Sequence, residues 1–168
     1  ETFIPLEQAP GQRVECDFGH IWVDFPEGRR QVPVLLVTWA YSYYPFAIAL
    51  PTERTEAILH GMARAFEFFG GVPNRISYDN SKISVAKIMG PRERKLSRDF
   101  LKLTSHFLFE PHFCLVRRPN EKGQVECLLG YARRNFLVPL PQVDAFKTLN
   151  DELQEKCRQD LGRRLWGK

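Results

Sequence analysis

The sequence contains no long apolar run and no paired cysteines, and each absence excludes a class of protein. No apolar stretch is long enough for a signal peptide or a membrane span, so we expect no membrane contact. The four cysteines are scattered without any Cys-x-x-Cys, which argues against a disulfide framework and against a tetrahedral zinc site. Since the chain begins with Glu1 and not Met, we expect a piece of a longer cytoplasmic protein with reduced core thiols.

The sequence also lacks a glycine-rich phosphate-binding loop of the Walker type, internal repeats and low-complexity tracts. Any nucleotide-driven step must therefore belong to another protein. What is present is a chain of 168 residues with 43% hydrophobic content. This length is enough to bury one sizeable core and short enough for one globular domain.

Positive charge is concentrated in one segment. The whole chain carries a net charge of +4, with a pI of about 9.0. Residues 82–102 contain seven basic side chains against Glu93 and Asp99, a local charge of +5. We place most of this cluster on the outer side of a helix. Such a face is either simply solvated or a surface that follows nucleic-acid phosphates.

Hydrophobic periodicity predicts an α/β domain, a five-stranded mixed sheet flanked by helices. Strand, helix and strand follow one another through short connections, so the fourth strand should lie parallel to a neighbour. Gly90-Pro91 is expected to open the second helix. We divide the chain into a core, residues 1–138, and a C-terminal amphipathic helix within 139–168 that packs on the core or on a partner. The predicted strands are 12–25, 32–38, 46–50, 75–78 and 113–116, and the predicted helices are 55–69, 91–107, 122–137 and 144–161.

Three acidic residues stand out by their positions in these elements. Asp17 lies inside the first strand, Asp79 ends the fourth strand, and Glu126 lies in the first turns of the third helix. If the first and fourth strands are neighbours, the three carboxylates converge and repel one another unless cations neutralise them. Hard oxygen ligands of this kind suit Mg²⁺ and a two-metal phosphoryl-transfer site.

Each acid also has an ordinary interpretation. Asp79 is a common type of turn residue, Glu126 can pair with Lys122 one helical turn earlier, and Glu15 and Asp24 are expected to be exposed strand acids. The order of the elements favours the metal-binding interpretation of the set. Aromatic residues such as Trp22 can either stack on bases or pack within the sheet, and we assign them no role.

Four stretches carry a family resemblance, and together they span most of the chain. They read VECDFG around Asp17, ISYDNSK around Asp79, CLVRRPNEKGQVE up to Glu126, and then YARRNFLVPL. The chain resembles the catalytic core of retroviral-type integrases and DDE transposases, and most closely the IstA-type insertion-sequence transposases. This resemblance implies a ribonuclease-H-like fold. The 46 residues between Asp79 and Glu126 are more than retroviral integrases have, so residues 82–102 cannot be matched one by one.

The resemblance implies a DNA transposase domain that cleaves phosphodiesters and transfers DNA strands. Asp17, Asp79 and Glu126 would be the catalytic residues and would hold two Mg²⁺ or Mn²⁺ ions. The implied partners are DNA, both transposon ends and target, a helper ATPase, and further copies of the chain on DNA, in an intracellular, nucleoid-associated setting. Two alternatives stay open: a ribonuclease-H-like nuclease without strand transfer, and a non-catalytic DNA-binding module. The expected DNA-phosphate contacts are Lys122, Arg133, Arg134, Lys82 and Lys87.

Overall fold

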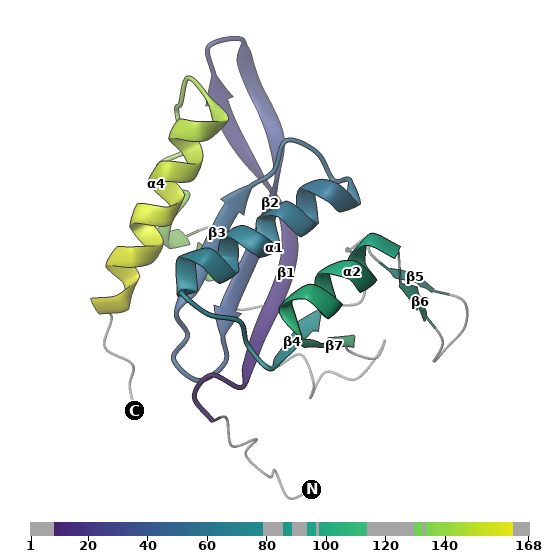
Figure 1. Cartoon of the computed structure of the whole chain (residues 1–168). Coiled ribbons are helices and arrows are strands. Elements are labelled where there is room, and N and C mark those ends of the chain that lie inside the picture. The colour runs from purple at the N-terminus through teal and green to yellow at the C-terminus, as the bar shows by residue number, and fades with distance from the viewer. Residues whose placement is uncertain are drawn as a thin grey trace, which may run out of the picture.

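The computed structural model describes residues 9–78, 86–88, 94–96, 98–113, 130–132 and 134–162. Its centre is a five-stranded mixed sheet in the order β3-β2-β1-β4-β7, which confirms the predicted fold class (Figure 1). Neighbours among the first three strands pair antiparallel, and β4 and β7 add in parallel. The strands are β1 (Arg13–Phe25), β2 (Gly28–Trp39), β3 (Pro45–Ala49), β4 (Arg75–Tyr78) and β7 (Glu110–Phe113).

Helices α1 (Thr55–Phe69) and α2 (Arg98–Phe107) cover one face of this sheet (Figure 1). Helix α1 buries Ile58, Met62 and Ala65, three residues of the predicted stripe. It approaches the sheet closely at Gly61, where an added Cβ would lie 2.9 Å from a methyl carbon of Leu35. The helix therefore sits directly on β2 and fixes the strands beneath it.

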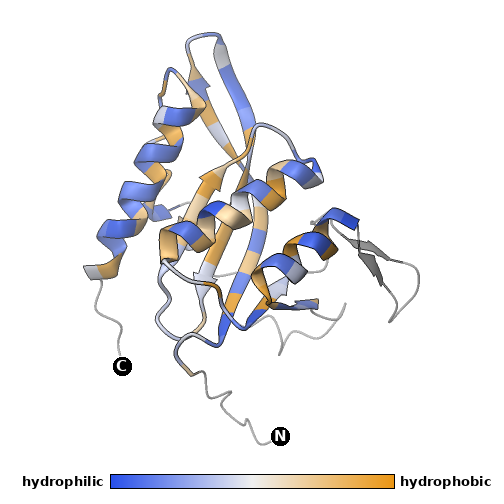
Figure 2. Ribbon diagram, viewed as in Figure 1, coloured by the Kyte–Doolittle hydropathy of each residue, from blue (hydrophilic) through white to orange (hydrophobic). Residues whose placement is uncertain are grey.

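Helix α4 (Phe146–Gln159) lies along β3, at the other end of the sheet from β7 (Figure 1). Its hydrophobic side faces the sheet and its outer side is hydrophilic (Figure 2). Leu149, Leu153 and Cys157 form one buried stripe and join a core with residues of β1, β2 and β3. A short 3-10 helix, η2 (Asp160–Gly162), follows α4.

The sheet separates two hydrophobic cores because side chains of a strand alternate between its faces. On β1, Val14, Cys16 and Phe18 join the core beneath α1, whereas Ile21 and Val23 join the core beneath α4. Odd-numbered residues of β1 therefore face away from α1. Cys16 and Cys157 are free and buried, as expected for core thiols.

Two predictions between residues 86 and 116 are wrong. The predicted helix 91–107 is wrong at its start, because β6 (Arg94–Leu96) pairs antiparallel with β5 (Ala86–Ile88) and α2 begins at Arg98. Helix α2 therefore carries only Arg98 and Lys102 of the seven basic residues, so most of the cluster is not on its outer side. The fifth strand of the large sheet is Glu110–Phe113, three residues earlier than predicted.

Candidate functional site

Asp17 occupies the middle of β1 and follows Cys16, the last residue of β1 whose pairing with β4 the structure describes. Its side chain is buried, with 6% of the residue exposed, and it points to the face opposite α1. The carboxylate oxygen Oδ1 accepts a hydrogen bond of 2.8 Å from the backbone N–H of Phe18. A buried acid held in a fixed orientation is suited to bind a cation or a polar substrate.

The end of β4 lies directly beside Asp17. The parallel register pairs Cys16 with Tyr78, the last residue of β4, which confirms that the first and fourth strands are neighbours. Tyr78 is fully buried, donates a hydrogen bond of 3.4 Å to Sδ of Met62 and stacks on Phe113 at a centroid distance of 5.2 Å. Helix α1 and β7 thus fix the residue that immediately precedes Asp79 in the sequence.

The structure describes few of the other predicted site residues. Arg134 is exposed, and its guanidinium lies over Gly130, where an added Cβ would come within 3.2 Å of it. Residues 130–132 and 134–135 are helical, at the end of the predicted third helix. Lys87 belongs to β5, but its side chain is not described. The positions that lie outside the described residues are Asp79, Lys82, Lys122, Glu126 and Arg133.

A second buried acid, Glu15, lies two residues before Asp17 on the same face of β1. Only 4% of it is exposed, so the expectation of an exposed strand acid is wrong. Its Oε1 lies 3.0 Å from Nη2 of Arg13, which is itself largely buried. Burial raises the pKa of the Glu15 carboxyl, and the charge of Arg13 partly offsets that rise.

Glu15 belongs to a polar row that crosses three parallel strands. The register places Glu15 beside Ser77 of β4, and Ser77 beside His112 of β7. Within the described part of the chain, Oγ of Ser77 and Nδ1 of His112 are buried without a hydrogen-bond partner, as is Nε of Arg13. The sequence could have indicated this polar row, because Arg13, Glu15 and Asp17 alternate along one strand and alternate strand residues share a face.

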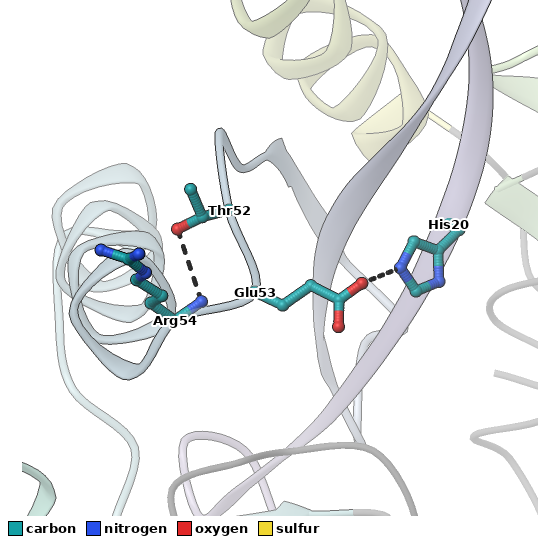
Figure 3. A network of polar contacts seen from close by, with 4 residues as sticks. All are labelled: His20, Thr52, Glu53 and Arg54. Carbon is teal, nitrogen blue, oxygen red and sulfur yellow. Dashed lines mark hydrogen bonds and ion pairs between the residues drawn. The ribbon is translucent and has the colours of Figure 1, made fainter.

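A polar contact beyond Asp17 connects β1 to the start of α1 (Figure 3). The imidazole Nε2 of His20 contacts the carboxylate of Glu53, two residues before the helix begins. In the same segment, Oγ1 of Thr52 accepts a hydrogen bond of 3.4 Å from the backbone N–H of Arg54. The Glu53 contact holds the segment before α1 against β1, three residues from Asp17.

Among the described residues, no group of three His, Cys, Asp or Glu side chains is placed to hold a metal ion. Asp17 and its face of β1 fit such an ion in chemistry, because a buried carboxylate offers the hard oxygen that Mg²⁺ prefers. No helix in the described part of the chain is long and apolar enough to cross a membrane.

The sheet order and the helices that cover the sheet define a ribonuclease-H-like fold, with a buried acid beside the β1–β4 junction. Solved structures share this fold. A bovine immunodeficiency virus (BIV) integrase catalytic core covers 94% of this chain and 88% of its own, with a TM-score of 0.57 and 10% identity. A chain of a simian T-cell lymphotropic virus intasome covers 89% of this chain and 50% of its own, with a TM-score of 0.54 and 13% identity.

Residues 7–119 match the integrase core domain family, and the chain belongs to it. A transposase of Aminobacter aminovorans is 32% identical over 94% of this chain and 31% of its own length. The IS640 transposase of Shigella sonnei is 30% identical over 90% of this chain and 48% of its own length. The IS21 transposase of Pseudomonas aeruginosa is 29% identical over 90% of this chain and 39% of its own length. The chain thus spans a third to a half of these relatives, and the predicted resemblance to insertion-sequence transposases is confirmed.

Proposed function

We propose that this chain is the catalytic core of a transposase related to that of IS21, which cleaves phosphodiester bonds and joins DNA strands with the help of divalent metal ions. The observation that carries the proposal is the register of Cys16 with Tyr78 beside the buried Asp17. Continued by one residue, that register would bring Asp79 opposite Asp17 on the same face of the sheet. Glu126 would complete the set from the third helix.

The three carboxylates would hold two Mg²⁺ or Mn²⁺ ions, which supply Lewis-acid activation of the attacking oxygen and neutralise charge on the leaving oxygen. The part of the protein is to orient these ligands. The N–H of Phe18 fixes one oxygen of Asp17 and would thereby orient the carboxylate as a ligand. Tyr78, locked between Met62 and Phe113, would set the position of Asp79.

The substrate would be DNA, first a transposon end and then a target. A water would attack in the cleavage step and a DNA 3′-hydroxyl in the joining step, with no covalent enzyme intermediate. The exposed Arg134 is available to a DNA phosphate. Lys122 and Arg133 belong to the same proposal, followed by Lys82 and Lys87. Further partners would be a helper ATPase and other copies of the chain on intracellular, nucleoid-associated DNA.

The test is Asp17→Asn, which keeps the shape of the side chain and removes its charge. We expect loss of metal-dependent cleavage and strand transfer, and weaker Mn²⁺ binding in calorimetry, with unchanged folding. Asp24→Asn is the matched control, since Asp24 lies on the same strand but pairs with Arg29 at 2.6 Å at the sheet surface. Full activity and full Mn²⁺ binding in the Asp17 variant would contradict the proposal.

A donor duplex with a free 3′-hydroxyl distinguishes the proposed activity from simple hydrolysis. A transposase core joins this end to a second duplex, whereas a ribonuclease-H-like nuclease only cuts. Joined products are read directly on a denaturing gel. Cutting without any joining, by a chain carrying its flanking domains, would favour the nuclease.

A further inference from the structure

An exposed tryptophan follows the site residue Asp17 on the same strand. Trp22 lies five residues further along β1 and is 53% exposed, although tryptophan is highly buried on average. It is not part of either hydrophobic core. Neither the fold nor the proposed chemistry uses this side chain.

A cavity of about 380 Å³ opens beside Trp22. That volume lies within the range of small-ligand pockets, about 300–1,000 Å³. One side of the cavity comes from β1, with Gln31 of β2, and the other from the segment that leads to α4. Among the described residues, no acidic side chain lines it. The lining residues are His20, Ile21, Trp22, Gln31, Leu137 and Leu140.

The cavity lies on the same border of β1 as Asp17. In the described part of the sheet, the ladder of β4 on β1 ends at Cys16, and the next bridge on that side joins Asp24 to Gln142. The hydrogen bonds from Asp24 N to Pro141 O, 2.9 Å, and from Val143 N to Asp24 O, 3.0 Å, secure that bridge. Asp17 and the cavity therefore both lie on the part of β1 between Cys16, where the described pairing with β4 ends, and Asp24, which bridges to Gln142.

The distance suits DNA held at Asp17. At about 3.3 Å per strand residue, His20 and Trp22 lie about 10 and 17 Å along β1 from Asp17. A duplex strand advances about 3.4 Å per nucleotide, so this interval corresponds to roughly three to five nucleotides. Asp17 faces away from α1, whereas the even-numbered His20 and Trp22 lie on the α1 side, so the DNA strand would reach the cavity across the border of β1 beyond Cys16.

The chemistry of the lining suits a nucleobase. An exposed indole offers a flat stacking surface, and the exposed Gln31 offers a donor and an acceptor for a base edge. The contact of His20 with Glu53 holds one wall in place (Figure 3). Leu137 and Leu140 supply an apolar floor for a base but no partner for a phosphate.

We propose that this cavity binds one unpaired nucleobase of the DNA strand engaged at Asp17, with the base stacked on Trp22 and its edge read by Gln31. The proposal rests on the proposed function and adds a base-binding subsite to it. A base can enter only when it leaves its helical stack, so unpaired ends should be preferred.

The test compares Trp22→Ala, Trp22→Phe and Tyr41→Ala in binding to a duplex with an unpaired end and to a fully paired duplex. Tyr41 is the matched control, an aromatic residue 42% exposed in the turn between β2 and β3. Trp22→Ala should weaken binding to the unpaired end by about 5- to 150-fold, as expected for one lost stacking contact. Trp22→Phe should retain most of the affinity, and Tyr41→Ala and the paired duplex should show little change.

Tryptophan fluorescence gives a second readout. Unpaired DNA should quench the emission of the chain, and that quenching should largely disappear in Trp22→Phe. Equal affinities of Trp22→Ala and Tyr41→Ala for the unpaired end would refute the base-binding subsite. So would a Trp22 variant that changes only self-association of the protein in sedimentation and leaves DNA binding unaltered. Wild-type chain that binds and cuts DNA while Trp22→Ala binds normally refutes this inference alone. Wild-type chain that binds neither duplex refutes the proposed function as well.

Discussion

Asn150 gives the sharpest test of how α4 completes the sheet. β3 is an edge strand, and the side chain of Asn150 takes the place of a further strand beside it. Its Oδ1 accepts a hydrogen bond of 2.7 Å from the backbone N–H of Ala49, and its Nδ2 donates one of 3.1 Å to the carbonyl of the same residue. Asn150→Ala removes both bonds and leaves two backbone groups of a buried residue unpaired.

The size of the effect follows from those two groups. An unpaired buried backbone group costs about 1–3 kcal/mol, and water reaches part of the half-buried Asn150, so we expect a loss of about 2–4 kcal/mol. That is a large share of the roughly 5–15 kcal/mol that stabilises a typical domain. Asn150→Asp should lose less, because it keeps an acceptor for the N–H of Ala49.

The assay is equilibrium unfolding in urea, with the midpoint as readout and the slope as a check on two-state behaviour. Glu152→Ala is the control, an exposed position two residues along the same helix, and it should change stability by less than about 0.5 kcal/mol. If Asn150→Ala and Glu152→Ala unfold at the same urea concentration, α4 does not stabilise the edge of the sheet in the way described.

Two further predictions concern charge. Burial raises the pKa of Glu15 above its ordinary value of 4.5, so the folded chain holds this proton more tightly than the unfolded chain. The contribution of Glu15 to stability is therefore greatest in acid and declines as pH rises above 4.5. In urea unfolding across pH 4–7, Glu15→Gln should make this decline in stability less steep. Identical pH profiles of the variant and the wild type would refute the prediction. Lys122→Ala should weaken DNA binding and reduce the slope of log affinity against log salt by about 1, whereas the exposed Lys147→Ala on α4 should leave it unchanged; an unaltered slope for Lys122→Ala would reject the phosphate contact.

Strong periodicity made the centre of the fold predictable from sequence. The alternating β1 and the stripe of α1 follow local rules, and the parallel β4 follows from the handedness of strand-helix-strand connections. The neighbourhood of Asp17 and β4 could be foreseen because topology, not side-chain detail, determines it. The burial of Glu15 could not be foreseen, since an acid on a strand is usually exposed and its burial here is compensated by the companion Arg13.

The errors between residues 86 and 116 have a common physical origin. Leu96 stands four residues before Phe100, as a helical stripe would require, but the chain uses Leu96 in the β5–β6 hairpin and starts α2 at Arg98. The fifth strand was predicted three residues too late because Glu110, Pro111 and His112 lack the apolar, β-branched character typical of strands. An edge strand tolerates charge and proline on its open side, so hydrophobicity understates it.

The polar face beside Asp17 explains why this corner of the sheet tolerates so much buried charge. Glu15 and Asp17 are two residues apart on one face, so each ionised carboxylate makes the other harder to bury. Arg13, 3.0 Å from Glu15, compensates one of the two charges from within the same strand. The carboxylate of Asp17 accepts the N–H of Phe18, and a bound cation would further lower the cost of burying its charge. The strand therefore carries a structural carboxylate, compensated by its own arginine, two residues from the carboxylate that we propose as a metal ligand.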